Sequence, residues 1–560
     1  MGRWTTMAER RRNRAVGKAA GPADGDDTGA GDVHARAVAA GRRLLDQLRP
    51  DARAWSVNGR DVLFTAGFDL DAEVGGLLTA TLDDGTVLLL QVHASRLVER
   101  EAAVVDMAAG MLADAGVDDG GLVASAKVGL HMRSMEGDAR VLGRLLDGRL
   151  DTSPVGPFAL GRLAVATPAQ VALVASPETG ANAVLTVGRL SQAEVPAALR
   201  ATGFSRHTFL VGQSGSGKTY SMGVLLEQLL LETTLPMVIV DPNSDHVHLG
   251  RLRAVDELNR GREKPLGSTA LAALRRRHAD AGKVVVAGRG PTADVALQIH
   301  LSDLTIGEQA LTVGLDPVLD AEEYGAFVDA TRALTGAAYS MRDIEAEVRA
   351  RADDAGRRLA QRIANLGVAD WSVWAAPGAA SLAGSTSLDW RVLVLDVGSL
   401  DDARERALVS LALLGAVRRR EQRRSVLIVM DEAHNVCPPD ATTPLGRAVT
   451  DHAVWIAAEG RKFGLHLLLA TQRPQKIHPN VLSQCDNLLL MRVNSVGDLA
   501  ALSTVFSHVP ATMVQESSSF GLGEMLAAGP VAPTPLRVRM GTRLTPEGGA
   551  DLPTDWARRR

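Results

Sequence analysis

The stretch FLVGQSGSGKTYSMGVLLEQLLL, from Phe209 to Leu231, decides the fold class of this 560-residue chain. It contains the pattern Gly-x-x-x-x-Gly-Lys-Thr, which runs from Gly212 to Thr219. An apolar run precedes the pattern and a leucine-rich segment follows it, as expected for a strand, a glycine-rich loop and a helix. A glycine-rich loop that arises by chance has no reason to lie between those two elements, so the stretch predicts a P-loop.

The residue types in this loop suit the binding of a nucleoside triphosphate. Glycines allow backbone N–H groups to turn inward around a phosphate. Lys218 is expected to reach the β- and γ-phosphates, and the Thr219 hydroxyl to ligate Mg²⁺. The helix from Tyr220 onward directs its positive N-terminus at the same anion. We therefore expect ATP and Mg²⁺ as cofactors, with the nucleotide bound by Gly212, Gln213, Ser214, Gly215, Ser216, Gly217, Lys218, Thr219 and Tyr220.

Carboxylates that follow other apolar runs are the candidates for metal binding and catalysis. In SVLIVMDEAH, Asp431 ends a predicted strand and can hold the Mg²⁺ shell. Glu432 is one residue further and can polarise the attacking water. In PMVIVDPNSDH, Asp241 also ends a strand and can approach the water or the metal, or can simply cap a helix or turn. An ordinary charged strand end is the corresponding alternative for Asp431 and Glu432.

Composition describes a globular protein and excludes several classes. The chain is 46% hydrophobic and 22% charged, with a net charge of −4, so no global charge indicates nucleic acid or membrane. A locally basic pore remains compatible with that balance. Two cysteines, Cys437 and Cys485, cannot form a disulfide framework or a four-ligand zinc site and are expected as reduced thiols in or near the core. The N-terminus lacks an apolar signal region and no run approaches the ~18 apolar residues of a membrane helix, so we expect a cytoplasmic protein without membrane contact.

Patterns along the chain divide it into seven expected segments. Short apolar runs such as GLLTATL, QVALVA and NAVLTVGRL alternate with Gly, Asp and Pro turns, which favours an antiparallel β-barrel. Longer continuous apolar runs alternate with helical patterns and favour a parallel α/β sheet. The segments are a disordered basic tail (1–30), a short helix (31–56), the barrel (57–198), the first part of a RecA-like ATPase (199–300), a helical insertion (301–385), the second part of the ATPase (386–543) and a C-terminal tail (544–560).

The fold class expected from these segments is α/β. Its core is a RecA-like P-loop ATPase with a mostly parallel sheet, to which an N-terminal β-barrel and a helical-bundle insertion are added. Two capping boxes are expected to start helices, Ser340 with Asp343 in the insertion and Ser399 with Asp402 in the second ATPase part.

A DEAH-box helicase of superfamily 2 would share the P-loop and the DEAH tetrapeptide. The distance from Lys218 to Asp431 is long for that class, and predicted strands intervene. No second motor domain with an arginine-rich motif is present in the sequence. A glutamate beside the magnesium aspartate, with an intervening strand, is instead the RecA-like plan.

Several blocks of this sequence resemble the HerA-type hexameric ATPases, which are relatives of the FtsK translocases. RHTFLVGQSGSGKT, VMDEAHNV, EGRKFGLHLLLATQRPQKIHPNVLSQCDNLLLMRVNSVGDL and LGEMLAAGP are similar to successive family motifs. IVDPNSDH resembles the block that usually reads Asp-Pro-His-Gly-Glu-Tyr; Asp241 is retained, whereas Asn243, Ser244 and Asp245 replace the usual residues. The resemblance covers roughly residues 130–543, and ARVLGRLLDG is similar to the family's N-terminal HAS-barrel.

This resemblance implies a homohexameric ring with ATP between subunits, double-stranded DNA in the central pore and ATP-driven translocation. It implies a separate nuclease or effector as partner, in DNA end processing or phage defence. Arg461 matches an arginine that reaches the neighbouring subunit's ATP, Arg206 matches a second interface arginine, and Gln472 matches the sensor at a strand end. The alternative for Arg461 is a surface salt bridge, worth ~0–1 kcal/mol.

Two other functions stay open at this point. A nucleotide-gated ring scaffold would assemble and activate a nuclease or other effector, with translocation incidental. A conjugation or secretion ATPase would need a membrane anchor or a membrane-bound partner and ranks last. No DNA-contacting residue is predicted, because the arginine run at 418–420 is more typical of a solvated helix end.

Overall fold

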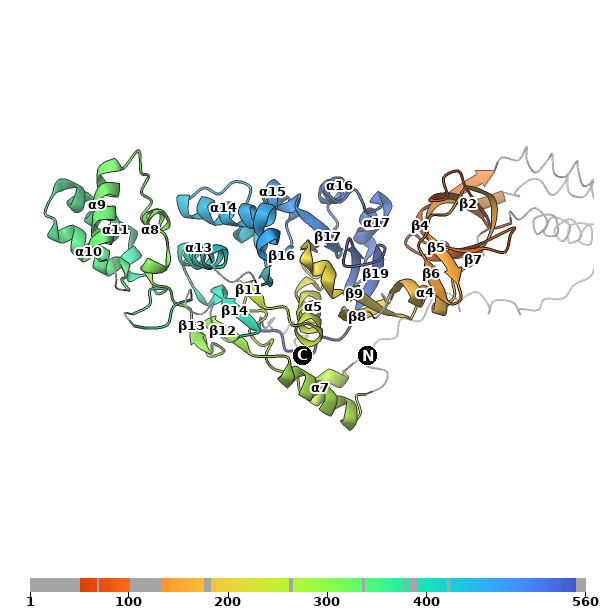
Figure 1. Cartoon of the computed structure of the whole chain (residues 1–560), viewed down its shortest axis with the longest axis horizontal. Coiled ribbons are helices and arrows are strands. Elements are labelled where there is room, and N and C mark those ends of the chain that lie inside the picture. The colour runs from red at the N-terminus through yellow and green to blue at the C-terminus, as the bar shows by residue number, and fades with distance from the viewer. Residues whose placement is uncertain are drawn as a thin grey trace, which may run out of the picture. The chain divides into compact units, whose positions relative to one another are not determined.

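The computed structural model describes residues 51–67, 70–100, 132–175, 183–260, 265–334, 338–376, 378–382, 390–419 and 424–549 (Figure 1). The expected basic tail (1–30), most of the expected short helix (31–56) and the end of the expected C-terminal tail lie outside the described residues.

A seven-stranded sheet forms the N-terminal β-domain, with antiparallel pairings of β1 with β7, β7 with β3, β3 with β4 and β5 with β6. Its order is β2-β1-β7-β3-β4-β5-β6, and an additional pairing between β2 and β5 closes it into a barrel. Buried residues alternate with more exposed ones along β2, where Val62, Phe64 and Ala66 are buried. The strands are β1 (Arg53–Ser56), β2 (Asp61–Ala66), β3 (Leu77–Leu82), β4 (Val87–Arg100), β5 (Met132–Leu146), β6 (Arg149–Asp151) and β7 (Phe158–Val165).

A twelve-stranded mixed sheet forms the α/β domain, in the order β13-β12-β14-β11-β15-β16-β10-β17-β18-β19-β8-β9. The eight strands from β13 to β17 are parallel to their neighbours, and the pairings from β17 to β9 are antiparallel. The strands are β8 (Val184–Leu190), β9 (Pro196–Arg200), β10 (His207–Val211), β11 (Met237–Asp241), β12 (Val284–Gly288), β13 (Val295–Ala296), β14 (Val392–Asp396), β15 (Val426–Met430), β16 (Leu465–Thr471), β17 (Cys485–Leu490), β18 (Glu524–Ala528) and β19 (Leu536–Met540).

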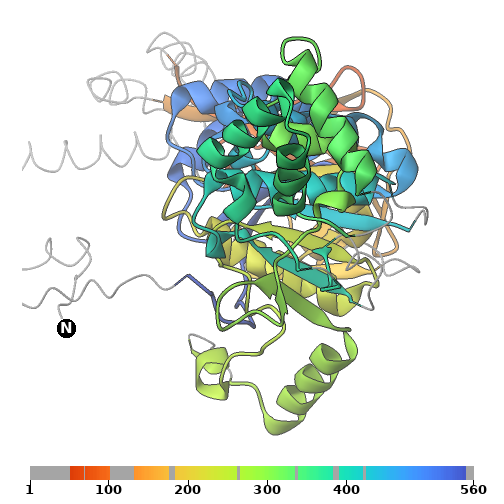
Figure 2. The ribbon, with the colours of Figure 1, turned by 90° about the vertical axis from the view of Figure 1, so that its left-hand side faces the viewer.

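Helices cover both faces of this sheet, which explains its continuous apolar strands. Every residue of β10, β11, β14, β15 and β16 is buried. One face packs against α5 (Lys218–Glu232) through Met222, Leu225 and Leu229, and the other against α13 (Ala403–Arg419) and α14 (Pro444–Glu459). The remaining helices of this domain are α6 (Val255–Asn259), α7 (Ser268–Asp280), α15 (Pro479–Leu482), α16 (Val496–Val505) and α17 (Ala511–Gln515) (Figures 1 and 2).

The helical insertion consists of α8 (Ile306–Thr312), α9 (Ala321–Ala333), α10 (Met341–Ala350) and α11 (Asp354–Leu366). These helices bury apolar side chains such as Phe327, Ile344 and Ile363. Ser340 and Asp343 form the expected capping box at the start of α10. The expected fold class, a mostly parallel P-loop core with a barrel and a helical insertion, is confirmed.

The second expected capping box is wrong. Helix α13 begins at Ala403, and the Ser399 hydroxyl donates to the Asp396 carbonyl instead of capping the helix. The Asp402 carboxylate accepts a hydrogen bond from the Arg404 backbone N–H, so it serves the first turn directly.

Two expected boundaries and one expected barrel strand also differ from the structure. Residues 53–56 form strand β1, not the end of a helix. QVALVA lies in α4 (Pro168–Ala175), because Thr167 and Gln170 exchange the hydrogen bonds of a capping box and Pro168 suits a first helical position. NAVLTVGRL supplies β8, which pairs with β19 in the large sheet, so the barrel ends before residue 184.

The structure also bears on the expected tail, the cysteines and the membrane. Leu544 and Thr545, expected in the C-terminal tail, are buried. Cys437 and Cys485 are buried free thiols, as expected, and burial raises the pKa of Cys437 to about 12. Among the described residues, no helix combines the length and apolar character needed to cross a bilayer.

Candidate active site

The carboxyl ends of four adjacent strands carry the predicted nucleotide site. Strands β11, β15, β16 and β10 are neighbours and parallel, so their ends meet at one edge of the sheet. The loop after β10 is the P-loop, and α5 begins directly behind it at Lys218. Loops at the carboxyl edge of a parallel sheet are the usual place for ligands in such folds.

Backbone conformation shows why the P-loop requires glycine. Gly215 and Gly217 have φ angles of +73° and +90°, in a region that side chains with a Cβ rarely adopt. The loop is fixed from outside by the Gly523 N–H, which donates to the Ser216 carbonyl at 3.0 Å. The Arg492 side chain donates to the Gly215 carbonyl at 2.9 Å, which places this arginine on the phosphate loop.

Lys218 contacts both predicted acidic residues of the DEAH segment. Its Nζ lies 2.6 Å from Asp431 Oδ1 and 3.2 Å from Glu432 Oε1, and all three side chains are buried. Burial alone would lower the pKa of Lys218, but the two carboxylates hold it above its ordinary value. The lysine is therefore charged and held where it can meet a phosphate.

Glu432 is held in an unusual backbone conformation. Its φ angle is +43°, which is strained for a residue with a side chain. Its Oε1 accepts a hydrogen bond from Gln472 Nε2 at 2.9 Å, and its Oε2 lies 3.3 Å from His434 Nδ1. Gln472, at the end of β16, thus contacts the predicted catalytic glutamate directly.

Asp431 also belongs to a cluster of three carboxylates. Oxygen atoms of Asp241, Asp245 and Asp431 lie within 4.8 Å of one another. Burial, followed by repulsion from Asp431, raises the pKa of Asp245 to about 6, and burial outweighs the backbone hydrogen bonds to raise that of Asp241 to about 7. These shifts mark carboxylates that a cation would stabilise.

The residues present fit Mg²⁺. Asp431 Oδ2 is buried and has no hydrogen-bond partner among the described residues, and a buried carboxylate oxygen without a donor suits a cation. Carboxylate and hydroxyl oxygens are the ligands that Mg²⁺ prefers, and Thr219 lies in the first turn of α5 beside Lys218.

Asp241 has a structural task as well. Its carboxylate accepts hydrogen bonds from the backbone N–H groups of Asn243, Asp245 and His246. The turn-cap alternative for Asp241 therefore describes its hydrogen bonds, while its place in the acidic cluster keeps it beside the predicted metal site. Sequence reasoning missed Asp245; the signal was a second carboxylate four residues after Asp241, within the block that departs from the family pattern.

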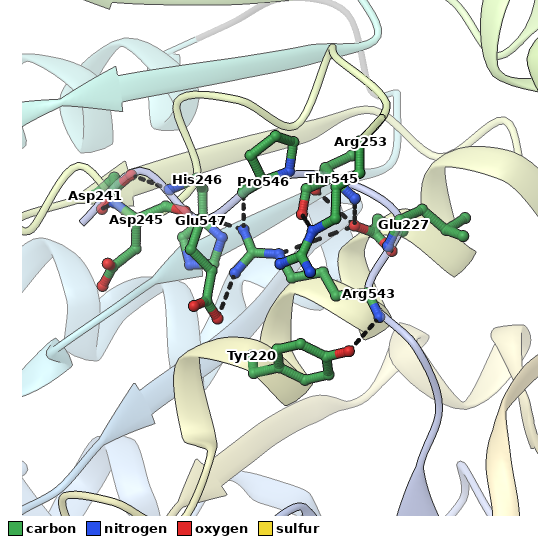
Figure 3. Close-up of polar contacts among 11 residues, drawn as sticks. Tyr220, Glu227, Asp241, Asp245, His246, Arg253, Arg543, Thr545, Pro546 and Glu547 are labelled. Carbon is green, nitrogen blue, oxygen red and sulfur yellow. Dashed lines mark hydrogen bonds and ion pairs between the residues drawn. The ribbon is translucent and has the colours of Figure 1, made fainter. Parts of the chain in front are cut away.

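Tyr220 does not direct its hydroxyl at the P-loop. The hydroxyl accepts a hydrogen bond from the backbone N–H of Arg543 at 2.7 Å (Figure 3). Within the predicted nucleotide-binding set, Ser216 is buried, Ser214 and Gly215 are exposed, and Gln213 is half-buried with its Oε1 bonded to the Asn494 N–H. Gly212 is buried beside Thr471, whose carbonyl accepts its N–H.

Arg206 and Arg461 lie together, away from these residues. Both contact Asp486 Oδ2, Arg206 Nη1 at 3.3 Å and Arg461 Nη1 at 3.8 Å, and all three side chains are about half exposed. Arg206 precedes β10, Arg461 precedes β16 and Asp486 is at the start of β17, so the group marks the amino edge of the parallel strands.

The length of β16 separates the two groups. This strand has seven residues, from Leu465 to Thr471, and connects the Arg461 turn to Gln472. At ~3.3 Å per residue it spans about 20 Å. Arg461 therefore lies at the opposite edge of the sheet from Lys218 of the same chain.

Comparison with protein families matches residues 185–364 to the family described as helicase HerA, central domain. A DNA double-strand break repair helicase HerA of Sulfurisphaera tokodaii is 29% identical over 160 residues, 27% of this chain and 31% of that protein. A probable DNA double-strand break repair helicase HerA of Methanocaldococcus jannaschii is 30% identical over 131 residues, 23% of this chain and 24% of that protein. The matched stretches thus span less than a third of either relative.

Two solved structures are also similar. VirB4 of Thermoanaerobacter pseudethanolicus matches with a TM-score of 0.43 and 16% identity, over 66% of this chain and 98% of that chain. The bacterial conjugative coupling protein TrwBΔN70 matches with a TM-score of 0.43 and 12% identity, over 67% of this chain and 91% of that chain. The sequence comparisons confirm the resemblance to HerA-type ATPases, and residues 185–364 are similar to the central domain of helicase HerA.

Proposed function

We propose that this chain is an ATP-driven double-stranded DNA translocase or helicase motor that acts as a homohexameric ring. One observation carries the ATPase part of the proposal. Lys218, Asp431 and Glu432 are buried in mutual contact at the end of a P-loop, with Gln472 bonded to Glu432. This arrangement provides a phosphate cation, a metal carboxylate and a water-activating carboxylate within one small volume.

Each residue has a distinct task in this reaction. The P-loop N–H groups and Lys218 bind the phosphates, and Thr219 and Asp431 would hold Mg²⁺, which neutralises charge on the phosphate oxygens. Glu432 orients the attacking water and accepts its proton. Gln472 connects Glu432 to the end of β16, so a change at the γ-phosphate can move the loop beyond that strand.

Two groups of residues at opposite edges of the sheet support the proposed ring. Arg206 and Arg461 are half exposed and lie a strand's length from their own P-loop, so in the proposed ring they would serve the site of a neighbouring copy. An arginine supplied in trans stabilises the charge of phosphoryl transfer and is worth ~10³–10⁵ in rate. A head-to-tail contact that brings each amino edge to the next carboxyl edge closes into a ring when its rotation permits.

The DNA part of the proposal rests on the relatives, which are named as DNA double-strand break repair helicases. We propose double-stranded DNA in the pore and a separate nuclease or effector as partner, in end processing or phage defence in the cytoplasm. The barrel would correspond to the HAS-barrel.

Arg418 lies over the Trp455 ring and Arg419 pairs with Glu308, so the described part of the arginine run has structural partners.

Two assays test this proposal. Wild-type protein should hydrolyse ATP, and DNA should stimulate this hydrolysis. The variants Lys218→Ala and Glu432→Gln should abolish ATP hydrolysis. Normal hydrolysis by both variants would refute the assignment of the site. The second assay measures displacement of the third strand from a DNA triplex. Displacement by the protein alone supports translocation, whereas hydrolysis without displacement would favour the ring scaffold.

A further inference from the structure

Residues Gly541–Gly549, here termed the C-terminal strap, follow β19 and are built into the α/β domain (Figure 3). The Arg543 side chain is fully buried, and Thr545 is buried as well. Burying a guanidinium is costly unless it is paired and hydrogen-bonded. The partners of Arg543 should therefore show what the strap does.

The Arg543 guanidinium is held by the strap itself and by the loop after β11. Its Nη2 donates to the Asp245 carbonyl at 3.0 Å and to the Pro546 carbonyl at 3.4 Å. Its Nη1 donates to Glu547 Oε1 at 3.2 Å. The planar group thus fixes the backbone of Asp245, one of the three clustered carboxylates.

The strap is also anchored on α5, the helix that follows the P-loop. The buried Glu227 carboxylate accepts hydrogen bonds from the N–H groups of Leu544 and Thr545, each at 2.7 Å, and from the Thr545 hydroxyl at 2.6 Å. Its Oε1 lies 3.9 Å from Arg543 Nε. Helix α5 and the strap therefore share one buried charged network.

Two contacts bring this network to the first turns of α5. The Tyr220 hydroxyl accepts the Arg543 N–H, and Tyr220 directly follows Thr219. Gly223 faces the same side chain so closely that a Cβ there would lie 2.4 Å from Arg543 Nε. The helix turn that carries the predicted metal-binding threonine rests directly on Arg543.

Asp245 is fixed from both sides of its peptide backbone. Its N–H donates to Asp241 Oδ1 at 3.0 Å, and its carbonyl accepts from both Arg543 Nη2 and the Gly548 N–H. The strap thus joins two segments that are distant in sequence, the acidic loop after β11 and the start of α5.

We propose that Arg543 is a positioning residue for Mg²⁺: through the strap it holds Asp245 and the first turn of α5 in a fixed mutual position, so that the carboxylates and Thr219 meet one metal ion. This inference rests on the proposed ATPase function. A buried ion pair is weak evidence for stability, since well-packed apolar residues can replace one without loss. Groups behind metal ligands, in contrast, typically change metal affinity by about 10- to 100-fold when they are altered.

Two variants disturb the strap by different routes. Arg543→Lys keeps the charge and removes the planar fork that reaches the Asp245 carbonyl. Gly548→Ala leaves Arg543 intact, but its Cβ would lie 1.8 Å from the Ser244 carbonyl and push the strap off the loop. The matched control is Gly325→Ala in α9, where a Cβ meets nothing within 4 Å.

The test measures binding of fluorescent ADP to the full chain, first in EDTA and then during titration with Mg²⁺, after thermal melting has shown that each variant is folded. We expect Arg543→Lys and Gly548→Ala to bind ADP normally in EDTA and to need about 10- to 100-fold more Mg²⁺ for the metal-dependent change, with the control like wild type.

A purely structural role would weaken ADP binding in EDTA as much as in Mg²⁺, and that result would overturn the inference. Unchanged Mg²⁺ midpoints in folded variants would overturn it too, and if Arg543→Lys does not fold, Gly548→Ala decides. Failure of wild-type protein to bind ADP would instead refute the proposed function.

Discussion

Replacing Arg461 by alanine separates a catalytic arginine from a surface ion pair, because the two roles predict effects of very different size. Arg461 Nη1 lies 3.8 Å from Asp486 Oδ2, and both side chains are 44% exposed. An exposed pair of this kind contributes ~0–1 kcal/mol, and solvent screening favours the lower end. If Arg461 forms only this surface contact, its replacement by alanine would therefore cause no measurable change in ATP hydrolysis.

As a trans-acting arginine, the same residue would contribute ~10³–10⁵ in rate, or roughly 4–7 kcal/mol of transition-state stabilisation. We expect Arg461→Ala to melt like wild type, to bind ATP and to hydrolyse it about 10³-fold more slowly or worse. Lys462→Ala is the matched control, since Lys462 is the adjacent cation and pairs with Glu459 at the surface. Steady-state phosphate release per subunit is the assay.

Mixing subunits tests whether the arginine acts in trans. Arg461→Ala subunits keep Glu432, and Glu432→Gln subunits keep Arg461, so some mixed interfaces regain both groups. Random mixing at equal amounts restores about one interface in four of a head-to-tail ring. Normal hydrolysis by Arg461→Ala, or no recovery at any mixing ratio, would refute a trans-acting arginine.

Two further predictions concern the arginine pair and the acidic cluster. Asp486→Asn removes the carboxylate shared by Arg206 and Arg461. Because the two arginine side chains would then be misplaced, we expect ATP hydrolysis to fall about 10- to 100-fold, with the free energy of unfolding changed by less than about 1 kcal/mol. Hydrolysis at the wild-type rate would show that Asp486 does not position the pair. Asp241 and Asp245 have pKa values raised to about 7 and about 6, so bound protons compete with Mg²⁺ below these values. The Mg²⁺ midpoint for ADP binding should rise as pH falls from 8 to 5.5, by about tenfold per pH unit for each proton displaced. A midpoint that does not depend on pH would contradict this account of the cluster.

Much of the fold follows from local pattern in the sequence. Continuous apolar runs such as VLIVM predict strands buried on both faces, and parallel strands bring their carboxyl ends to one edge. Lys218, Asp431, Glu432 and Gln472 come from three separate strand ends, and the structure brings all four together at that edge. The positions of these residues at the ends of predicted parallel strands were therefore enough to predict the main geometry of the site.

Other features depend on contacts between segments distant in sequence. The sequence of the β8–β9 hairpin resembles that of the barrel strands. Only the pairing of β8 with β19 places this hairpin in the large sheet. Arg543 is a single arginine near the end of the chain, and its sequence neighbours give no sign that Glu227 and Asp245 surround it. Helix α4 differs from these cases, because the capping residues Thr167 and Gln170 were visible in the sequence.

ATP binding and hydrolysis by Glu432→Gln test the central claim most directly. Amide replacement keeps the size of the side chain and an acceptor for Gln472 while it removes the group that takes the proton from water. The account predicts that the variant binds ATP as wild type does and hydrolyses it about 10²–10⁴-fold more slowly, as expected for loss of a general base. Hydrolysis at the wild-type rate with ATP fully bound would contradict it.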